Sequence, residues 1–455
     1  MRQLKTLLLS LPLAFASMSL VDARDASACG GCFVSQSEST QVTGHRMILS
    51  VSKDQTTLWD QIVYQGNPAS FAWVLPIKGQ VDIGLSSDAM FETLELATEV
   101  VISSPTISCT PPGCFFPPSD GVGVTGSSSA GGGGVTVIAQ EVVGPYDTVQ
   151  LSSADSLALK KWLTDNGYSV PADIGPVIDS YVAEGFDFLA LKLVPGQGID
   201  SMRPVRITSP GATPLLPLRM VAAGTGSVTP ISLWVVGEGR YEPTNFPTFE
   251  IDPEDVVWNW DSSSSNYKEL RTAGFEATQG KAWLYEAAEP VSTWQIEYPL
   301  KDLVDFNPTE SGYGDASGMG ADQELQEDLA ALYGSIDPNS LWLMRLHAEL
   351  PRSALATDLE IGASQNQSSV VRFFQASKTL GTAPSCPPPP PGCEDPNNNS
   401  GENNTWSGFW DDENAEGSSS GCAIGGGVGS SAVLGSLALS LGLALARRRR
   451  QKRST

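Results

Sequence analysis

The sequence predicts an α+β fold of largely antiparallel sheets with a few helices, followed by a disordered stalk and a C-terminal transmembrane helix. Strand-like segments outnumber helical ones and do not alternate with them, which argues against a parallel βαβ order. From about residue 384 the chain is rich in Pro, Asn, Ser, Gly and acidic residues, so it cannot bury a core there. Near the C-terminus, an uncharged run of about 24 residues would form a helix about 36 Å long, which is enough to cross a bilayer core.

The first 28 residues have the pattern of a signal peptide. Arg2 and Lys5 precede an apolar stretch over residues 7–20, which is too short for a comfortable membrane span. Two small-residue cleavage sites follow, one after Ala23 and one after Ala28. We therefore expect the mature chain to be exported.

Residues 29–383 are predicted to form the exported α+β domain. Runs of β-branched, aromatic and aliphatic residues predict its strands. These strands are expected at residues 41–51, 57–64, 70–77, 135–143, 186–194, 205–208, 218–223, 231–236, 281–286, 293–297, 341–346 and 370–374. Apolar side chains of the first three, among them Ile48, Leu49, Trp59 and Trp73, are expected to cover one face of a sheet.

Helices are predicted at four places in the same domain, over residues 88–100, 154–166, 174–184 and 322–333. Ser86 or Ser87 is the candidate N-cap of the first helix, and Ser152 or Ser153 is that of the second. A long Pro- and Gly-rich stretch at about residues 105–134 is predicted to be a surface loop. We find no repeat of fixed period in the chain.

Two segments follow the domain. Residues 384–421 are predicted to be a Pro-rich knuckle and an acidic, disordered stalk. Residues 422–455 are predicted to be a transmembrane or sorting tail, in which four arginines at 447–450 follow the uncharged run. By the positive-inside rule this basic cluster stays cytoplasmic before any processing, so the domain and stalk face outward. We expect the protein to be anchored in the membrane or on the outer cell surface.

The balance of charge is strongly acidic. The chain has 27 Lys and Arg against 51 Asp and Glu. The exported part is more acidic still, because most of the charges at the two ends are cations. Such a surface repels nucleic acid and anionic lipid head groups, so no nucleic-acid partner is expected.

Seven cysteines occur in the chain, and disulfides persist in exported proteins. Six of them form close pairs and are disulfide candidates: Cys29 with Cys32, Cys109 with Cys114, and Cys386 with Cys393. Cys422 is left over at the start of the tail, where it is a candidate for sorting or lipidation. Cys29 and Cys32 also have redox spacing, and cleavage after Ala28 would give Cys29 the position of a lipoprotein cysteine; a structural disulfide is the preferred interpretation.

Candidate catalytic groups are few. His45 and His347 are the only histidines; His45 lies in a predicted strand beside Arg46, and His347 lies at the end of the predicted strand 341–346, near Arg345. A Ser-His-Asp or Cys-His site must use one of them, and the alternative is a half-buried strand residue. A G-x-G-x-x-G match at 121–126 lacks the strand and helix that a dinucleotide site needs. The catalytic residues therefore stay unknown, and no metal or cofactor is predicted.

Tryptophans concentrate in the middle of the chain, at Trp234, Trp258, Trp260, Trp283 and Trp294. Their large apolar rings with one polar N–H suit a ligand-binding face. Packing in the core is the commoner use of such residues, and both interpretations stay open.

A series of segments stands along the chain in this order: Ala28-Cys29-Gly30-Gly31-Cys32-Phe33, Phe71-Ala72-Trp73-Val74-Leu75-Pro76-Ile77, Trp162-Leu163 with Asn166-Gly167-Tyr168, Tyr181-Val182, Phe188-Leu189-Ala190-Leu191-Lys192-Leu193, the stretch 214–220, and Arg345-Leu346-His347. In this order they resemble the bacterial family called domain of unknown function 2330, over most of residues 29–377. The resemblance implies an exported location and a single fold unit. It brings no catalytic residues, because the family has no established activity.

The tail resembles a second known element, the myxobacterial carboxy-terminal sorting signal. Cys422, the uncharged run after it and the arginines at 447–450 match that signal's cysteine, hydrophobic helix and basic cluster. The resemblance implies processing near Cys422 by a sorting protease and transfer to the outer surface.

These observations predict a cell-envelope or surface-anchored protein of unknown activity, with a non-catalytic binding or structural ectodomain. The expected partners are the membrane, through the C-terminal helix, a sorting protease, and an envelope protein or a polysaccharide. The alternative is a secreted, surface-tethered hydrolase that acts on peptide or glycan. Acidic residues are abundant, but no spacing selects two of them as a glycosidase pair.

Overall fold

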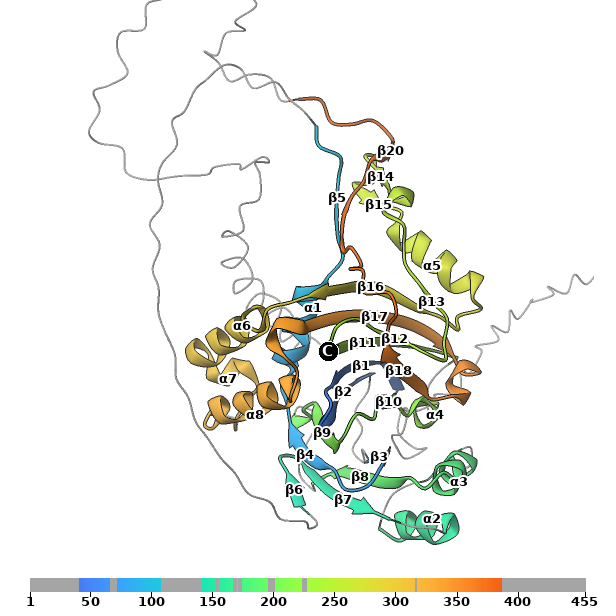
Figure 1. Cartoon of the computed structure of the whole chain (residues 1–455), viewed down its shortest axis with the longest axis vertical. Coiled ribbons are helices and arrows are strands. Elements are labelled where there is room, and N and C mark those ends of the chain that lie inside the picture. The colour runs from blue at the N-terminus through green and yellow to red at the C-terminus, as the bar shows by residue number, and fades with distance from the viewer. Residues whose placement is uncertain are drawn as a thin grey trace, which may run out of the picture.

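The computed structural model describes residues 41–65, 72–107, 141–152, 155–166, 170, 174–194, 201–222, 227–315 and 317–386 (Figure 1). Within these ranges the chain is a mixed α+β fold with eight α-helices and mostly antiparallel sheets, which confirms the predicted fold class at this level. No helix in the described ranges is long and apolar enough to span a membrane. The predicted signal peptide and sorting tail, and the predicted stalk beyond residue 386, lie outside these ranges and stay predictions.

An eight-stranded sheet forms the centre of the fold (Figure 1). Its strands in spatial order are β13 (Thr248–Phe249), β16 (Trp283–Pro290), β17 (Leu341–Pro351), β11 (Val228–Glu238), β1 (Gln41–Val51), β2 (Gln55–Gln65), β9 (Val205–Pro210) and β4 (Asp82–Leu85). β1 is parallel to β11 and β13 is parallel to β16, whereas the other neighbours are antiparallel.

Both faces of the central sheet are buried. Ile48 and Trp59 belong to one apolar cluster, while Leu49 and Leu58 belong to another. The expectation that Ile48, Leu49 and Trp59 share one face is therefore wrong. Successive side chains of a strand point to opposite faces, so a strand with consecutive apolar residues needs cover on both sides.

Helices α1 (Asp88–Thr98), α6 (Thr293–Phe306) and α8 (Ala321–Tyr333) cover the first face. α1 begins as predicted, because Ser87 Oγ accepts a hydrogen bond from the Ala89 N–H at 3.0 Å. α7 (Pro308–Ser311) follows α6 on the same side of the molecule (Figure 1).

A second layer of strands covers the other face of the sheet. It contains a four-stranded sheet, β3 (Ala72–Ile77), β8 (Asp187–Leu193), β7 (Tyr146–Leu151) and β6 (Glu141–Val143), and a three-stranded sheet, β10 (Leu215–Leu216), β18 (Leu359–Ala363) and β12 (Tyr241–Pro243). Trp73 and Leu75 of β3 and Leu359 of β18 belong to the same apolar cluster as Leu49 of β1.

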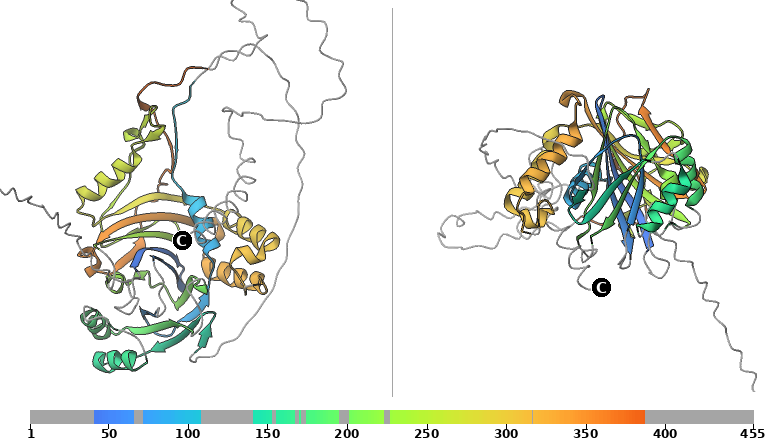
Figure 2. Two further views of the ribbon diagram at one scale, coloured as in Figure 1. Left: turned by 180° about the vertical axis from the view of Figure 1, so that it is seen from behind. Right: turned by 90° about the horizontal axis from the view of Figure 1, so that it is seen from below.

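Helices α2 (Ser156–Asp165) and α3 (Gly175–Ala183) pack on the outer face of the four-stranded sheet, where Val74 and Phe188 meet Leu163 and Ile178. The layers therefore run helix, sheet, sheet, helix. Figure 2 shows α6 and α8 on one side and α2 and α3 on the other. α4 (Leu218–Val221) links the second layer to α3.

Smaller elements lie at the β13 end of the sheet. They are α5 (Tyr267–Ala277), the pair β5 (Val101–Ser103) and β19 (Phe373–Gln375), and the sheet of β14 (Val257–Asn259), β15 (Ser264–Ser265) and β20 (Lys378–Leu380). Short 3-10 turns occur at Pro253–Asp255, Pro338–Ser340 and Ala354–Ala356. Phe374 and Val256 are the buried centre of this region.

Some predicted elements were wrong. Residues 218–223 contain helix α4, and residues 293–297 begin helix α6. In α6 the capping box of Ser292 and Gln295 opens a helix whose apolar residues recur at helical spacing. The N-cap of α2 is Asp155, in place of Ser152 or Ser153.

Most predicted cysteine positions lie outside the described residues, namely Cys29, Cys32, Cys109, Cys114, Cys393 and Cys422. Cys386 is described and is disulfide-bonded. Its partner lies outside the described ranges, so the pairing with Cys393 stays a prediction. Most of the loop at 105–134 and the 121–126 motif are also outside them.

Candidate functional site

A cleft with a volume of about 360 Å³ opens between the two layers of strands. Its floor is the central sheet and its walls come from the second layer. The residues of the floor are Leu49, Thr56, Leu58, Ile207 and Ser209; those of the walls are residues 75–78, Phe186, residues 213–215, Pro217, Thr244, Glu360 and Ile361. This size and mostly apolar lining are typical of small-molecule sites.

The cleft exists because the second layer is split. β3 is the last strand of the four-stranded sheet, and β10 is the last strand of the three-stranded sheet (Figure 1). The residues at 75–78 all line the cleft although side chains alternate along a strand. The edge of β3 itself therefore faces the opening.

The hydroxyl of Thr56, on the floor of the cleft, holds the wall segment before β10 in place. Thr56 Oγ1 donates a hydrogen bond to the Gly211 carbonyl at 2.9 Å and accepts one from the Thr213 N–H at 2.8 Å. The segment that leads into β10 is thus held over β2. Because the Thr56 hydroxyl already donates one hydrogen bond and accepts another, it holds the structure together and is not assigned to a ligand.

Two charged side chains line the cleft, Lys78 and Glu360, and both are exposed. Lys78 Nζ lies 4.7 Å from the centre of the Phe186 ring, which is a cation–π distance. Within the described part of the chain, neither side chain forms an ion pair. The cleft thus combines an apolar interior with one cation and one anion at its surface.

A smaller cavity, of about 10 Å³, adjoins the cleft and shares Leu58, Leu75 and Pro217 with it. Its lining is apolar except for Asp60. The Asp60 carboxylate lies 3.3 Å from Nδ1 of His45, and both side chains are buried. His45 Nε2 is buried and has no hydrogen-bond partner among the described residues.

His45 does not form the catalytic arrangement considered from the sequence. It points to the opposite face of the sheet from Arg46, because the two are successive in β1. Arg46 contacts α1 through Glu92 and Glu95. No described hydroxyl lies within hydrogen-bond distance of His45, so no described side chain there can act as its nucleophile.

His347 has a closer resemblance to a catalytic group. Its Nδ1 lies 3.5 Å from Ser232 Oγ, and its Nε2 lies 3.6 Å from Glu349 Oε1. Burial, followed by the charges of Arg271 and Arg345, lowers the pKa of His347 to about 3. A general base works best with a pKa near the working pH, so this histidine is a poor base.

The surroundings of Ser232 also argue against hydrolysis. Ser232 lies in the middle of β11, between Arg46 of β1 and His347 of β17. The backbone N–H groups of such an inner strand are used in the sheet, so they are not free to stabilise an oxyanion. Neither the cleft nor the small cavity beside it is lined by Ser232 or His347.

Arg345, the neighbour predicted for His347, belongs to a charged cluster beneath α1. Glu95 accepts hydrogen bonds at 2.9 Å from both Arg46 and Arg345, whose guanidinium groups lie 5.4 and 5.6 Å from the Trp234 ring. Glu286 Oε2 lies 2.8 Å from Arg345 Nε, and burial raises the pKa of Glu286. The cluster pairs its own charges and ties α1 to the sheet.

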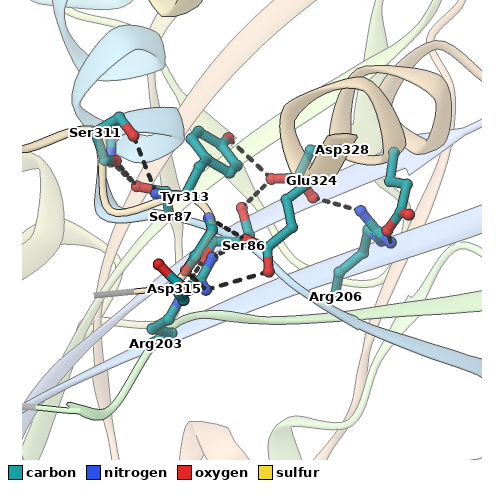
Figure 3. Close-up of polar contacts among 12 residues, drawn as sticks. Ser86, Ser87, Arg203, Arg206, Ser311, Tyr313, Asp315, Glu324 and Asp328 are labelled. Carbon is teal, nitrogen blue, oxygen red and sulfur yellow. Dashed lines mark hydrogen bonds and ion pairs between the residues drawn. The ribbon is translucent and has the colours of Figure 1, made fainter. Parts of the chain in front are cut away.

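A second buried network surrounds Asp328 of α8 (Figure 3). Its carboxylate accepts hydrogen bonds from Trp59 Nε1 at 3.0 Å, Arg206 Nη1 at 2.8 Å and Tyr313 Oη at 2.9 Å, and also from Ser86 Oγ. Burial raises its pKa, and the Arg206 charge opposes that rise. With four donors on a fully buried carboxylate, the network leaves no acceptor for a substrate.

Sequence reasoning missed this network, although a signal was present. The buried side chains of α8 recur as Leu325, Leu329 and Leu332, and Asp328 lies in the same stripe. A carboxylate in an apolar stripe must be paired in the interior.

The tryptophans do not share a ligand-binding face. Trp234 and Trp283 are fully buried in the clusters on opposite faces of the central sheet. Trp258 and Trp260 contact each other edge to face, at 6.2 Å between ring centres, and Trp294 is half exposed on α6. Core packing is therefore the role of the two central rings.

The described residues contain no group of three or more His, Cys, Asp or Glu side chains that could hold a metal ion. In the comparisons with known proteins, a family model described as "Uncharacterized protein conserved in bacteria (DUF2330)" matches residues 23–304. No curated protein matches the chain. One solved structure, the crystal structure of baculovirus P35, aligns at 10% identity and a TM-score of 0.25; the alignment covers 45% of this chain and 66% of that chain, just under two thirds of its length.

Proposed function

We propose, from the premise that the chain belongs to the bacterial family of uncharacterized proteins DUF2330, that it is a surface-anchored binding protein of the cell envelope without catalytic activity. The observation that carries the proposal is the cleft of about 360 Å³ between the two layers of strands. The two histidine contacts described above, His45 with Asp60 and His347 with Ser232, do not line this cleft. An open apolar cleft without such groups favours binding over chemistry.

The sequence of the two ends supports the proposed location. A signal-peptide pattern at 1–28 leads to export, and the tail at 422–455 combines Cys422, an uncharged run and four arginines. We propose that a sorting protease acts near Cys422, and that the acidic stalk at 384–421 holds the domain away from the membrane. An envelope protein or polysaccharide at the surface is the proposed partner.

The intact mass and the membrane partition of the native protein test the location. They are compared with those of a Cys422→Ala variant. We expect the native chain to end near residue 422 and the variant to keep its tail. If both keep the full tail, processing is wrong and the protein is an ordinary single-pass membrane protein.

Binding of a neutral apolar fluorophore, N-phenyl-1-naphthylamine, tests the cleft. Ser209 lies on the floor of the cleft and is half-buried, so Ser209→Trp is expected to fill the cleft and abolish the fluorescence increase. Ser340→Trp makes the same change at an exposed site outside the cleft and is expected to bind as the native protein does. Unchanged binding by Ser209→Trp, or no binding by the native protein, would refute the proposed site.

The second candidate is a surface-tethered hydrolase that acts on peptide or glycan. The observation in its favour is the contact between Ser232 and His347 at 3.5 Å. Turnover of a p-nitrophenyl ester by the native protein, and its loss in Ser232→Ala, would establish this activity. We expect no turnover by either, because His347 has a low pKa and lies outside both the cleft and the cavity that adjoins it.

A further inference from the structure

Lys78 and Glu360, which line the cleft, form no ion pair within the described chain, whereas charged side chains near the cleft do. Arg219, close to the same wall, pairs with both Glu184 and Asp358. The pKa of Glu184 is lowered mainly by its hydrogen bonds from Arg219 and least by the charge of Lys78. Lys78 and Glu360 thus stay available, within the described chain, to charges on a ligand.

One cation and one anion on the lining select the head group. A purely anionic head would meet Glu360, and a purely cationic head would meet Lys78. A head group with both charges meets neither repulsion and pairs with both side chains. The lining therefore fits a zwitterion best.

The walls of the cleft also discriminate against a peptide. A peptide that extends a sheet needs main-chain donors and acceptors along the edge strand. Three prolines line this cleft, Pro76 on β3, and Pro214 and Pro217 on either side of β10, and each lacks an N–H. Proline on an edge strand is a common protection against strand addition.

We infer that the cleft binds a single-chain amphiphile with a zwitterionic head group, whose apolar chain lies between the two sheets. The anionic part of the head group pairs with Lys78, and the cationic part pairs with Glu360. This inference rests on the proposed binding function and adds the chemical class of the ligand.

Calorimetric titration with n-alkyl phosphocholines tests the chain. Hexyl, octyl and decyl forms are compared as monomers, below the concentration at which they form micelles. Each buried CH₂ contributes about 0.8 kcal/mol, so we expect the affinity to rise about fourfold per CH₂ until the cleft is full. An affinity that does not depend on chain length would overturn the inference.

The head group is tested with octyl sulfate and octyltrimethylammonium beside octyl phosphocholine. Lys78→Met is expected to weaken phosphocholine and sulfate roughly two- to fivefold and to strengthen trimethylammonium, as removal of an exposed ion pair does. Glu360→Gln is expected to weaken phosphocholine and trimethylammonium by a similar factor and to strengthen sulfate. Both side chains are exposed, so both variants are expected to fold.

Lys268→Met and Glu269→Gln on α5 are the matched controls, because they make the same charge changes at exposed positions outside the cleft. They are expected to bind like the native protein. If affinity rises with chain length but ignores both cleft substitutions, the head-group assignment fails while the binding function stands. If no amphiphile binds but N-phenyl-1-naphthylamine does, the ligand class is wrong; if neither binds, the proposed function fails as well.

Discussion

Asp328 is the residue on which the junction of α8 with the sheet depends. It pairs with Arg206, whose side chain is 7% exposed, and accepts hydrogen bonds from three further side chains. An intact buried ion pair of this kind contributes little net free energy to folding. Removal of one partner is costly, because it leaves the other charge buried without compensation. The consequence can be measured.

Asp328→Ala is expected to lower the free energy of unfolding by about 3–5 kcal/mol, because Arg206 would stay buried without its carboxylate. The neighbouring Glu327 lies 3.5 Å from the same guanidinium but is 49% exposed, so Glu327→Ala is expected to cost less than about 1 kcal/mol. Urea unfolding of the three proteins provides the comparison. Equal losses for the two variants would contradict the structural role of Asp328.

His347 gives the protein an acid-sensitive group. Its folded-state pKa is about 3, below the ordinary 6.5, so its contribution to stability is complete above pH 6.5 and is lost as the pH falls toward 3. In that window the unfolded chain binds a proton that the folded chain excludes. The loss approaches about 1.4 kcal/mol per pH unit.

His347→Gln is therefore expected to be less sensitive to acid than the native protein. The measurement is the difference in unfolding free energy between pH 6.5 and pH 4.5, by urea, for the native protein and the variant. A difference of the same size in both proteins would show that the proton is not excluded from His347 in the folded state.

At the scale of elements, some local signals in the sequence predicted the structure and others did not. The cap at Ser87 and the inner strands were predictable from residue type and apolar runs. The sequence did not predict α5, because Phe275 is the one buried residue of this helix and the others form no apolar stripe. The β-branched and aromatic residues at the start of α6 favour a strand, whereas the capping box of Ser292 and Gln295 indicates the helix that the structure has.

The capping box at the start of α6 is expected to stabilise the protein. The Ser292 N–H donates to Gln295 Oε1 at 2.7 Å, and the Ser292 side chain accepts from the backbone of the same turn. Ser292→Ala is expected to lower the unfolding free energy by about 1 kcal/mol. Ser340→Ala, at an exposed serine that is not the N-cap of an α-helix, is expected to change it by less than about 0.5 kcal/mol. Equal values in urea unfolding would mean that the box does not stabilise α6.

At the scale of the whole molecule, the sequence predicted the mixed α+β fold class, but it did not predict the cleft. The cleft brings together residues near 76, 186, 214 and 360, which belong to different sheets and loops. No local pattern encodes their meeting, because it depends on how the second layer divides. Burial on both faces of the central sheet was missed for a related reason, since consecutive apolar residues in β1 were assigned to one face.

The two-sided sheet is itself testable with two adjacent residues. Ile48 faces the helices and Leu49 faces the second layer of strands, and both are almost completely buried. Ile48→Ala and Leu49→Ala are each expected to lower the unfolding free energy by about 2–5 kcal/mol. Thermal or urea unfolding measures these losses. A small loss of unfolding free energy at either position would mean that this face of the sheet is exposed.

The parallel pairing of β1 with β11 has a consequence for the time course of folding. His45 lies opposite Ile231, and every strand of the four-stranded sheet is synthesised between them. Closing so long a loop has a large entropic cost, and pairings of this kind form slowly. Until β9 (Val205–Pro210) is present, β2 has β1 as its only neighbour in the sheet, and such a lone hairpin is marginally stable in water. The outer neighbours of β1 and β2 are thus made only at residues 205–210 and 228–238, and an early chain that folds late is what the proposed export requires.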